Sequence, residues 1–285
     1  MSPTRMVILG AGGFLGRALK RDLAREGIET LALARDDLDL ERPGAGRLVA
    51  QTIRPDDSVV LLSALTPDRG RDIATLMRNL TMVQNFCAAG PECAQVIYLS
   101  SDAVYPLSQA KISEVTCAAP DDLYGSMHKV REVMLQNTLK SPLAILRSSM
   151  LYGPDDTHNS YGPNRFRRQA VEEGQITLGG EGEETRDHVL VDDAAAVVRL
   201  CATHRSVGTL NIATGSSASF MDVARLVARQ FDEPIEIKTS SRRSPISYRS
   251  FDTTACLHAF PTFHFTPLEK GLADVHIASL EPAGA

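Results

Sequence analysis

Short apolar runs alternate with helical patterns along the first half of the chain. The apolar runs have the length of strands buried on both faces, and they cover residues 5–9, 30–34, 58–62, 94–99 and 143–146. Stretches with apolar positions at helical spacing lie between them, at residues 14–25, 46–53, 71–89 and 123–139. Continuous apolar strands separated by helices predict an α/β fold with a doubly wound parallel sheet.

The pattern changes after about residue 148. Residues 152–185 are rich in Gly, Asn, Asp and Pro, which predicts loops, and the glycine-rich run at 178–182 predicts a hairpin turn. Further helices are expected at 192–201, 220–231 and near 267–278, with strands at 209–212 and 234–237. We therefore expect a large domain formed by residues 1–150 with about 186–215, and a smaller, discontinuous substrate domain formed by about 151–185 with 216–285.

The composition indicates which kinds of partner and which cell compartment to expect. The 285 residues carry 30 Lys and Arg against 35 Asp and Glu, a net charge of −5, so neither nucleic acid nor a membrane is expected as a partner. No apolar run reaches the roughly 18 residues that span a bilayer, and the N-terminus lacks the layout of a signal peptide. The five cysteines are not spaced as a zinc or redox site, so we expect no metal and a cytoplasmic protein with reduced thiols.

A glycine-rich turn joins the first strand to the first helix. Residues 7–16 read V-I-L-G-A-G-G-F-L-G, which gives Gly10, Gly13 and Gly16 the spacing of a dinucleotide-binding turn. Gly10 permits the tight turn, Gly13 lets the backbone approach a pyrophosphate, and Gly16 lets helix and strand pack closely. Phe14 and Leu15 open the helix, whose N-terminal N–H groups favour phosphate. The pattern predicts a Rossmann-type domain that binds a nicotinamide dinucleotide.

The end of the second strand bears on which dinucleotide binds. NAD sites usually place Asp or Glu there, to hold the ribose hydroxyls. Here the strand ends in Ala34 and Arg35, and an arginine suits a 2′-phosphate better than a bare hydroxyl. Asp36 or Asp37 serves NAD if the strand ends later. We therefore favour NADP(H) and leave NAD(H) open.

Five motifs occur in order along the chain. They are the glycine turn, S-S-D-A-V-Y at 100–105 with Y-G-S-M-H-K at 124–129, Y-G-P at 152–154, R-D-H-V-L-V-D-D at 186–193, and N-I-A-T-G at 211–215. With them the chain resembles the extended short-chain dehydrogenases/reductases, the NAD(P)-dependent nucleotide-sugar epimerase/dehydratase family, over nearly its whole length. The resemblance implies an enzyme that oxidises, reduces or epimerises a nucleoside-diphosphate sugar by hydride transfer.

The resemblance also implies roles for several residues. Ser101 matches the residue that hydrogen-bonds the reacting sugar oxygen, and Tyr124 matches the acid/base that exchanges a proton with it. Ser63 and Ala64 follow the third strand, where the family's loop covers the cofactor. A phenol has a pKa of about 10, so Tyr124 needs a nearby positive charge to act as a base at neutral pH.

One position departs from the family pattern. The family has Tyr-x-x-x-Lys, whereas here His128 stands at that spacing from Tyr124 and Lys129 comes one place later. At about 100° per residue, His128 points about 40° from Tyr124 and Lys129 about 140° from it. We interpret His128 as the residue in the lysine role, which bonds the nicotinamide ribose and, when protonated, supports a phenolate. Two alternatives stay open: His128 itself carries the proton, or the protein binds cofactor without turnover.

A second departure concerns the reaction. Dehydratases of the family carry an Asp-Glu pair after the Ser/Thr, and here Asp102 is followed by Ala103. One carboxylate is missing, so a 4-keto-sugar reductase or an epimerase is favoured over a 4,6-dehydratase, and Asp102 becomes a substrate-binding candidate. A catalytically degenerate NADP-binding sensor or scaffold, and a reductase of a non-sugar carbonyl, remain as alternative functions.

The resemblance implies that the nucleoside diphosphate binds across the C-terminal segments of the chain. Arg186 matches the arginine that contacts the diphosphate, and Arg249 is a second candidate, because a guanidinium bonds phosphate oxygens in pairs. Asn164 or Asn159 matches an asparagine that meets the diphosphate near the Y-G-P loop. In many relatives the two long helices after the third and fourth strands form a dimerising bundle, so a homodimer is expected.

Overall fold

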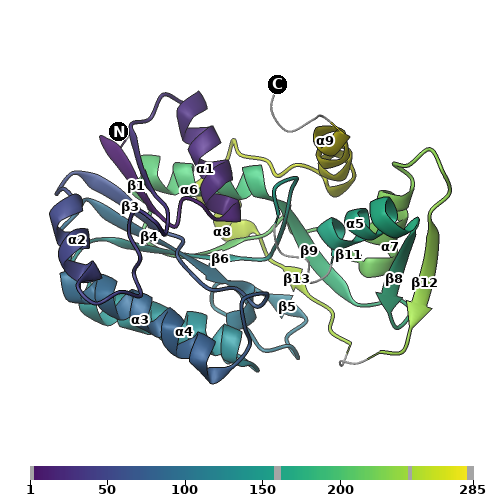
Figure 1. The fold of residues 1–285 in the computed structure, drawn as a ribbon, viewed down its shortest axis with the longest axis horizontal. Helices are drawn as coiled ribbons and strands as arrows, with labels where there is room; N and C mark the ends of the chain where they lie inside the picture. The colour runs from purple at the N-terminus through teal and green to yellow at the C-terminus, as the bar shows by residue number, and fades with distance from the viewer. Residues whose placement is uncertain (1–2, 157–161, 243–245, 281–285) are drawn as a thin grey trace.

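A parallel sheet of six strands forms the centre of the molecule (Figure 1). The computed structural model describes residues 3–156, 162–242 and 246–280. The strand order is β10-β6-β4-β3-β1-β2, and each neighbouring pair runs parallel. The strands are β1 (Arg5–Leu9), β2 (Thr30–Leu33), β3 (Asp57–Leu61), β4 (Gln95–Ser101), β6 (Leu143–Ser148) and β10 (Gly208–Ile212).

Helices cover both faces of this sheet (Figure 1). One face packs against α1 (Phe14–Arg25) and α6 (Val191–Thr203), and the other against α2 (Ala45–Thr52), α3 (Ile73–Ala89) and α4 (Leu123–Thr138). Side chains alternate between two cores along each strand, so on β4 Ile97 joins the core under α1 and α6, and Tyr98 joins the core under α3 and α4. The predicted Rossmann-type α/β fold is confirmed.

A second group of elements lies beside the end of the sheet at which its strands finish (Figure 1). Its strands form three small sheets, β11-β9-β7, β12-β8 and β13-β5. These strands are β5 (Lys111–Ile112), β7 (Met150–Tyr152), β8 (Gln175–Gly179), β9 (Thr185–Leu190), β11 (Ser217–Ser219), β12 (Glu236–Ser240) and β13 (Ser250–Phe251). The remaining helices are α5 (Pro163–Glu173), α7 (Phe220–Ala228), α8 (Thr254–Ala259) and α9 (Leu268–Leu280). A third apolar core joins α5, α7, α9 and β8.

Two expectations for residues 152–185 are wrong. The region holds helix α5, which begins with Pro163 in its first turn and buries Phe166 and Ala170, four residues apart on one face. The run at 178–182 is not a hairpin, because β8 pairs with β12 whereas β9 pairs with β7 and β11. The run instead connects two separate sheets. The division of the chain into two domains stays a prediction.

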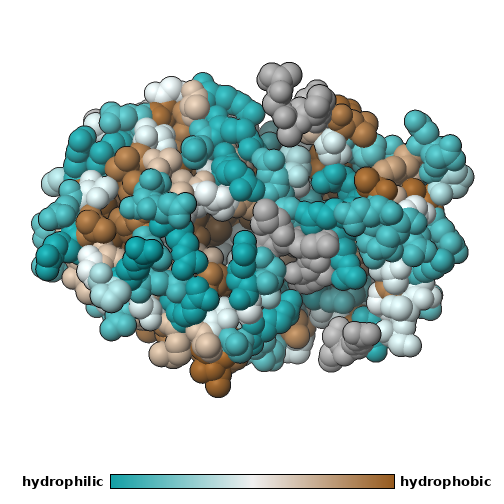
Figure 2. Space-filling model, viewed as in Figure 1, coloured by the Kyte–Doolittle hydropathy of each residue, from teal (hydrophilic) through white to brown (hydrophobic). Residues whose placement is uncertain are grey.

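The surface in the view of Figure 2 is largely hydrophilic. Hydrophobic residues gather mainly on the left, where the large sheet and its helices lie. Within the described ranges, no helix is long and apolar enough to cross a membrane. The same ranges contain no group of three or more His, Cys, Asp or Glu side chains placed to hold a metal ion.

Candidate active site

One large cavity lies at the ends of the central strands. It has a volume of about 880 Å³ and is lined by residues that follow β1, β3, β4 and β6, together with residues from the smaller sheets. Ligands bind at this edge of doubly wound sheets. All the predicted site residues line it, apart from Ser63: Gly10, Gly13, Phe14, Leu15, Gly16, Arg35, Ala64, Ser101, Asp102, Tyr124, His128, Asn164, Arg186 and Arg249. Asn159, the alternative to Asn164, lies outside the described residues.

The glycine turn between β1 and α1 leaves no room for a side chain at Gly10 or at Gly16. Gly10 has a φ of 94°, which favours glycine, and a Cβ there would lie 2.8 Å from the Ser63 nitrogen. A Cβ on Gly16 would lie 2.6 Å from the Gly10 carbonyl oxygen, so Gly16 allows α1 to pack closely on the turn. Gly13 is the N-cap of α1, and no side chain caps this helix end. The N–H groups of its first turn are therefore left for an anion.

Arginines line the cavity from the segments between β2 and β4. They are Arg35, Arg69, Arg71 and Arg78. Glu41 links two of them, since it lies 3.1 Å from Arg35 and accepts a hydrogen bond of 2.7 Å from Arg78 Nε. Asp37 does not line the cavity, and its carboxylate accepts from the Ala34 N–H at 2.9 Å. Beyond β2 the cavity wall thus carries arginines, of which Arg35 and Arg78 share the carboxylate of Glu41.

Buried polar contacts hold the chain that follows β3. Asn79 on α3 accepts from the Leu65 N–H at 2.8 Å and donates to the Leu65 carbonyl at 3.0 Å. The Ser63 carbonyl accepts from Arg131 at 2.6 Å, on the side of α4. Ala64 lines the cavity and Ser63 does not, so the role of Ser63 toward a cofactor stays a prediction. The backbone of Ser63 lies between Gly10 of the glycine turn and the Arg131 guanidinium.

Ser101 and Tyr124 reach the cavity from different elements. Ser101 ends β4 and caps a short 3-10 helix, Asp102–Val104, with its Oγ accepting from the Ala103 N–H at 3.1 Å. Tyr124 lies in the first turn of α4. The next residue, Gly125, packs so closely on the Ala103 carbonyl that no side chain fits. The start of α4 therefore lies directly against the turn that presents Ser101.

His128 lines the same cavity as a buried residue. It is 4% exposed, and burial together with the Arg131 guanidinium holds its pKa well below the usual value. Its Nδ1 lies 2.7 Å from the Tyr98 hydroxyl, and its Nε2 has no hydrogen-bond partner among the described residues. Its ring meets the Tyr124 ring edge-on, with centroids 4.8 Å apart. Burial therefore favours the neutral imidazole, and the support of a phenolate by a protonated His128 stays a prediction.

Lys129 points away from the cavity, as helix geometry predicts. It does not line the cavity, and its Nζ lies 3.6 Å from Glu132. Glu132 is fully buried, forms a closer ion pair with Arg147 at 2.7 Å, and accepts from Ser100 at 2.7 Å. Lys129 thus belongs to an ion-pair network between α4, β4 and β6.

Arg249 and Asp102 form an ion pair at the cavity wall. Arg249 Nη1 lies 2.9 Å from Asp102 Oδ2, and its Nη2 donates to the Tyr105 carbonyl at 2.7 Å. Arg249 is only 3% exposed. Each charge neutralises the other, so Arg249 does not offer the cavity a free positive charge.

Arg186 and Asn164 also line the cavity with their polar groups bonded. Arg186 pairs with Glu184, and its Nη2 lies 2.6 Å from the Ser247 hydroxyl. Asn164 accepts from the Gly153 N–H of the Y-G-P loop at 3.2 Å. A diphosphate bound here competes with Glu184 for Arg186.

Two residues near the candidate site were missed by sequence reasoning. Tyr98 bonds His128, and Arg131 is fully buried with its charge 5.2 Å from the centre of the Tyr98 ring. Arg131 stands three places after His128, on the same helix face, which is a signal that the sequence carries. Tyr98 has no comparable signal, because an aromatic residue in an apolar strand is ordinary core.

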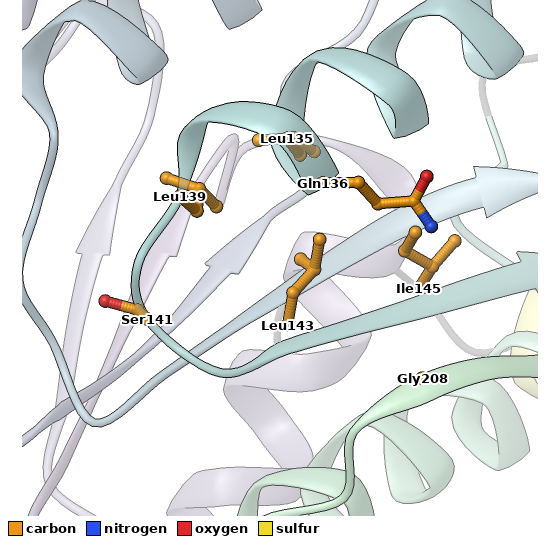
Figure 3. Close-up of a pocket in the computed structure, with 7 residues that line it drawn as sticks. All are labelled: Leu135, Gln136, Leu139, Ser141, Leu143, Ile145 and Gly208. Carbon is orange, nitrogen blue, oxygen red and sulfur yellow. The ribbon is translucent and has the colours of Figure 1, made fainter.

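A second, smaller cavity lies between the end of α4 and β6 (Figure 3). Its volume is about 220 Å³. It is lined by Leu135, Gln136, Leu139, Ser141, Leu143, Ile145 and Gly208. These side chains are mostly apolar and include no titratable group, so they provide no acid, base or charged ligand.

A family model matches the sequence, and the curated proteins that match it include the two described below. The model described as the NAD dependent epimerase/dehydratase family matches residues 6–213. The dTDP-L-rhamnose 4-epimerase of Burkholderia thailandensis is 28% identical over 165 residues, 55% of this chain and 46% of that protein, so the match spans less than half of the relative. A Streptomyces antibioticus protein named "Probable dTDP-4,6-dihydroxy-2-methyloxan-3-one 4-ketoreductase" is 30% identical over 236 residues, 80% of this chain and 77% of that one.

Solved structures share the fold. A GDP-L-fucose synthetase from Naegleria fowleri, bound to NADP, has a TM-score of 0.82 at 17% identity. The alignment covers 98% of this chain and 95% of the synthetase. MoeE5 in complex with UDP-glucose and NAD has a TM-score of 0.80 at 22% identity, over 97% of this chain and 99% of its own. At these identities the likeness shows the fold alone. The family model and the S. antibioticus relative show more: this chain belongs to the NAD dependent epimerase/dehydratase family, a family of enzymes.

Proposed function

We propose that the protein is an NAD(P)-dependent oxidoreductase or epimerase that acts by hydride transfer at a ring carbon of a nucleoside-diphosphate sugar. The observation that carries the proposal is that Ser101, Tyr124 and His128 line one cavity with the glycine turn. The two curated relatives, named as a dTDP-sugar 4-epimerase and a 4-ketoreductase, support the same class of substrate.

The glycine turn fits a nicotinamide dinucleotide. Side chains are excluded at Gly10 and Gly16, and the N-terminus of α1 has no side-chain cap. The residues assigned to the cofactor are Ser63, which does not line the cavity, and nine residues that do: Gly10, Gly13, Phe14, Leu15, Gly16, Arg35, Ala64, Tyr124 and His128. When bound, the dinucleotide supplies or accepts a hydride. The chain itself binds the phosphates on backbone N–H groups and moves the proton.

We favour NADP(H) over NAD(H). Arg35 lines the cavity, whereas Asp37 bonds its own turn and does not line the cavity. A guanidinium pairs with a 2′-phosphate, while a ribose hydroxyl is better held by a carboxylate. The structural neighbours, solved with NADP and with NAD, support a nicotinamide cofactor of either kind.

Tyr124 and Ser101 have the chemistry to handle a sugar oxygen. The Tyr124 phenol donates a proton to a carbonyl oxygen during reduction and takes it back during oxidation. The Ser101 Oγ accepts from the Ala103 N–H, and its contact with Asp102 is long at 3.5 Å. The Ser101 proton is therefore left for the substrate oxygen. Together the two residues hold and protonate one oxygen.

Reduction or epimerisation is favoured over dehydration. Expelling water from the sugar needs an acid and a base, and Ala103 leaves one of the two carboxylates missing. Asp102, the other, is ion-paired with Arg249 at 2.9 Å. We infer that Asp102 and Arg249 shape the sugar pocket, and that Arg186 and Asn164 lie near the diphosphate.

We also propose a homodimer through α3 and α4. These helices expose large apolar side chains, namely Ile73, Met77, Val130 and Val133. Size-exclusion chromatography with light scattering is expected to give twice the mass of one chain, 30.9 kDa. A single-chain mass at micromolar concentration contradicts the dimer and leaves the activity proposal untouched.

The test of activity is the consumption of NADPH with a panel of 4-keto nucleotide sugars. Loss of NADPH absorbance with at least one member, under conditions in which Tyr124→Phe is inactive, is the expected result. Binding of NADPH without its consumption by any member, and without interconversion of nucleotide sugars that are epimers at a ring carbon, favours a second function, an NADP-binding sensor. The burial of His128, at the position where the family has lysine, is the observation that supports this alternative. Turnover of simple non-sugar ketones alone points instead to a reductase of another carbonyl class.

A further inference from the structure

The hydrogen bond between Tyr98 and His128 has a fixed direction. The Tyr98 hydroxyl lies 2.7 Å from His128 Nδ1, and the two residues are 1% and 4% exposed. Burial raises the pKa of Tyr98, so the phenol keeps its proton. Among the residues that the structure describes, this hydroxyl has no other acceptor. Tyr98 therefore donates, and His128 Nδ1 accepts.

The direction of this bond decides where the imidazole proton lies. A neutral imidazole carries one proton, so an accepting Nδ1 leaves that proton on Nε2. In the described part of the chain, Nε2 has no hydrogen-bond partner, although it is buried and belongs to a residue that lines the large cavity. An N–H donor is thus buried at the cavity wall without an acceptor.

Arg131 opposes a second proton on this ring. It is fully buried, and the described residues include no carboxylate within ion-pair distance of it. Its Nη2 donates to the Ser63 carbonyl, and its guanidinium lies 5.2 Å from the Tyr98 ring centre. The titratable or charged groups that face His128 are Tyr98 from β4, and Tyr124 and Arg131 from α4. None of them is an anion, so none stabilises an imidazolium.

We propose that Tyr98 is a positioning residue that holds His128 as a neutral Nε2–H donor for an acceptor oxygen of the dinucleotide in the cavity. The inference rests on the proposed function, because it requires a dinucleotide in the cavity. It makes residue 128 a cofactor-binding donor rather than a carrier of charge or protons. Tyr98, which sits behind it, touches neither cofactor nor substrate.

The first test reads the tautomer directly in the protein without ligand. Nitrogen-15 spectra of histidine-labelled protein distinguish a protonated ring nitrogen from an accepting one, and His128→Gln assigns the signal among seven histidines. We expect a protonated Nε2 and an accepting Nδ1 from about pH 5 to about pH 8, the range in which exposed imidazole titrates. Tyr98→Phe is expected to convert this into a mixture of tautomers. Tyr152→Phe, at a buried tyrosine that does not line the cavity, is the matched control and leaves the signal unchanged.

The second test compares two amides at position 128. The glutamine side-chain nitrogen matches the reach of imidazole Nε2, and that of asparagine matches Nδ1. We expect His128→Gln to bind NADPH within about threefold of wild type, and His128→Asn to bind about tenfold more weakly, the size of one hydrogen bond. The ratio of kcat between wild type and His128→Gln is expected to stay constant with pH, because neither side chain titrates.

The outcomes separate this inference from the proposed function. A protonated Nδ1 or a charged ring at neutral pH overturns the inference, whatever the activity. Equal loss of NADPH affinity in His128→Gln and His128→Asn overturns it as well. A protein with the expected spectrum and the expected order of affinities, but with no turnover of any nucleotide sugar, supports the inference while the proposed reaction fails. If a variant does not fold, the wild-type spectrum alone decides.

Discussion

Replacing Gly13 with alanine separates binding of the dinucleotide from folding. Gly13 caps α1 with φ −73° and ψ 173°, which alanine adopts without strain. The added Cβ would lie 3.3 Å from the Gly10 carbonyl oxygen, so the neighbour has to give by only a few tenths of an ångström. We expect the free energy of unfolding to fall by about 1 kcal/mol or less.

The same methyl group has a large expected effect on affinity. In the proposed binding mode, this methyl group occupies the point at which the backbone of the turn approaches the pyrophosphate. Loss of one N–H bond to a charged phosphate oxygen costs about 1.5–3 kcal/mol, which raises the Kd for NADPH about 10- to 150-fold. Titration calorimetry measures this Kd, and urea unfolding measures the stability of the same preparation.

Gly46→Ala is the matched control for this experiment. Gly46 lies in α2, does not line the cavity, and would place its Cβ 2.7 Å from the backbone oxygen of Asn85. That backbone cannot move freely, so we expect a loss of about 1–3 kcal/mol in stability with an unchanged Kd for NADPH. A wild-type Kd in Gly13→Ala would refute the assignment of the turn to the cofactor. A loss of NADPH affinity that is proportional to the loss of stability in both variants would refute it too.

Three further variants test other parts of the site. Tyr124→Phe is expected to lower turnover about 10²- to 10⁴-fold with an unchanged Kd for NADPH, and near-normal turnover would remove Tyr124 from the reaction. Arg35→Ala is expected to weaken NADPH binding about tenfold and to leave NADH binding unchanged; equal effects on both would contradict a 2′-phosphate contact. Burial lowers the pKa of His188 to about 3, so the unfolded chain binds a proton below about pH 6.5 that the folded chain does not. The free energy of unfolding is therefore expected to fall by about 2 kcal/mol from about pH 7.5 to about pH 5 on account of this residue. His188→Asn should remove that part of the pH dependence, as measured by urea unfolding at several pH values. An unchanged pH dependence would show that His188 titrates normally.

Local chemistry is enough to predict the parts of the fold that bind the cofactor. Helix α1 was expected at 14–25 and spans Phe14–Arg25, because a glycine N-cap and a regular apolar face mark its ends. The central strands were found because strands buried on both faces are continuous apolar runs. Helix α5 was missed because its Gly, Pro and Asn residues resemble a loop, although Pro at the first turn and Phe166 with Ala170 were signals of a helix.

The protonation state of His128 could not be read from its spacing to Tyr124. It depends on Tyr98, thirty positions earlier in the chain, and on the burial that the packing of α4 on β4 creates. The same holds for Arg249, a candidate phosphate ligand in the sequence that the fold pairs with Asp102 across 147 positions. A side chain that the sequence suggests is available to bind a ligand becomes unavailable when the fold pairs it with an opposite charge. Burial away from water likewise changes its protonation state.

Transfer of deuterium tests the central proposal most directly. The enzyme is incubated with NADPH deuterated at the nicotinamide C4 position that donates hydride, together with the 4-keto nucleotide sugar that gives the largest NADPH consumption. Mass spectrometry of the product sugar is expected to show one deuterium on the reduced ring carbon, absent with Tyr124→Phe. A product without deuterium would contradict hydride transfer from the bound cofactor to the sugar. A protein that binds NADPH, leaves each keto-sugar of the panel unchanged and interconverts no epimeric nucleotide sugars would contradict hydride transfer in this cavity.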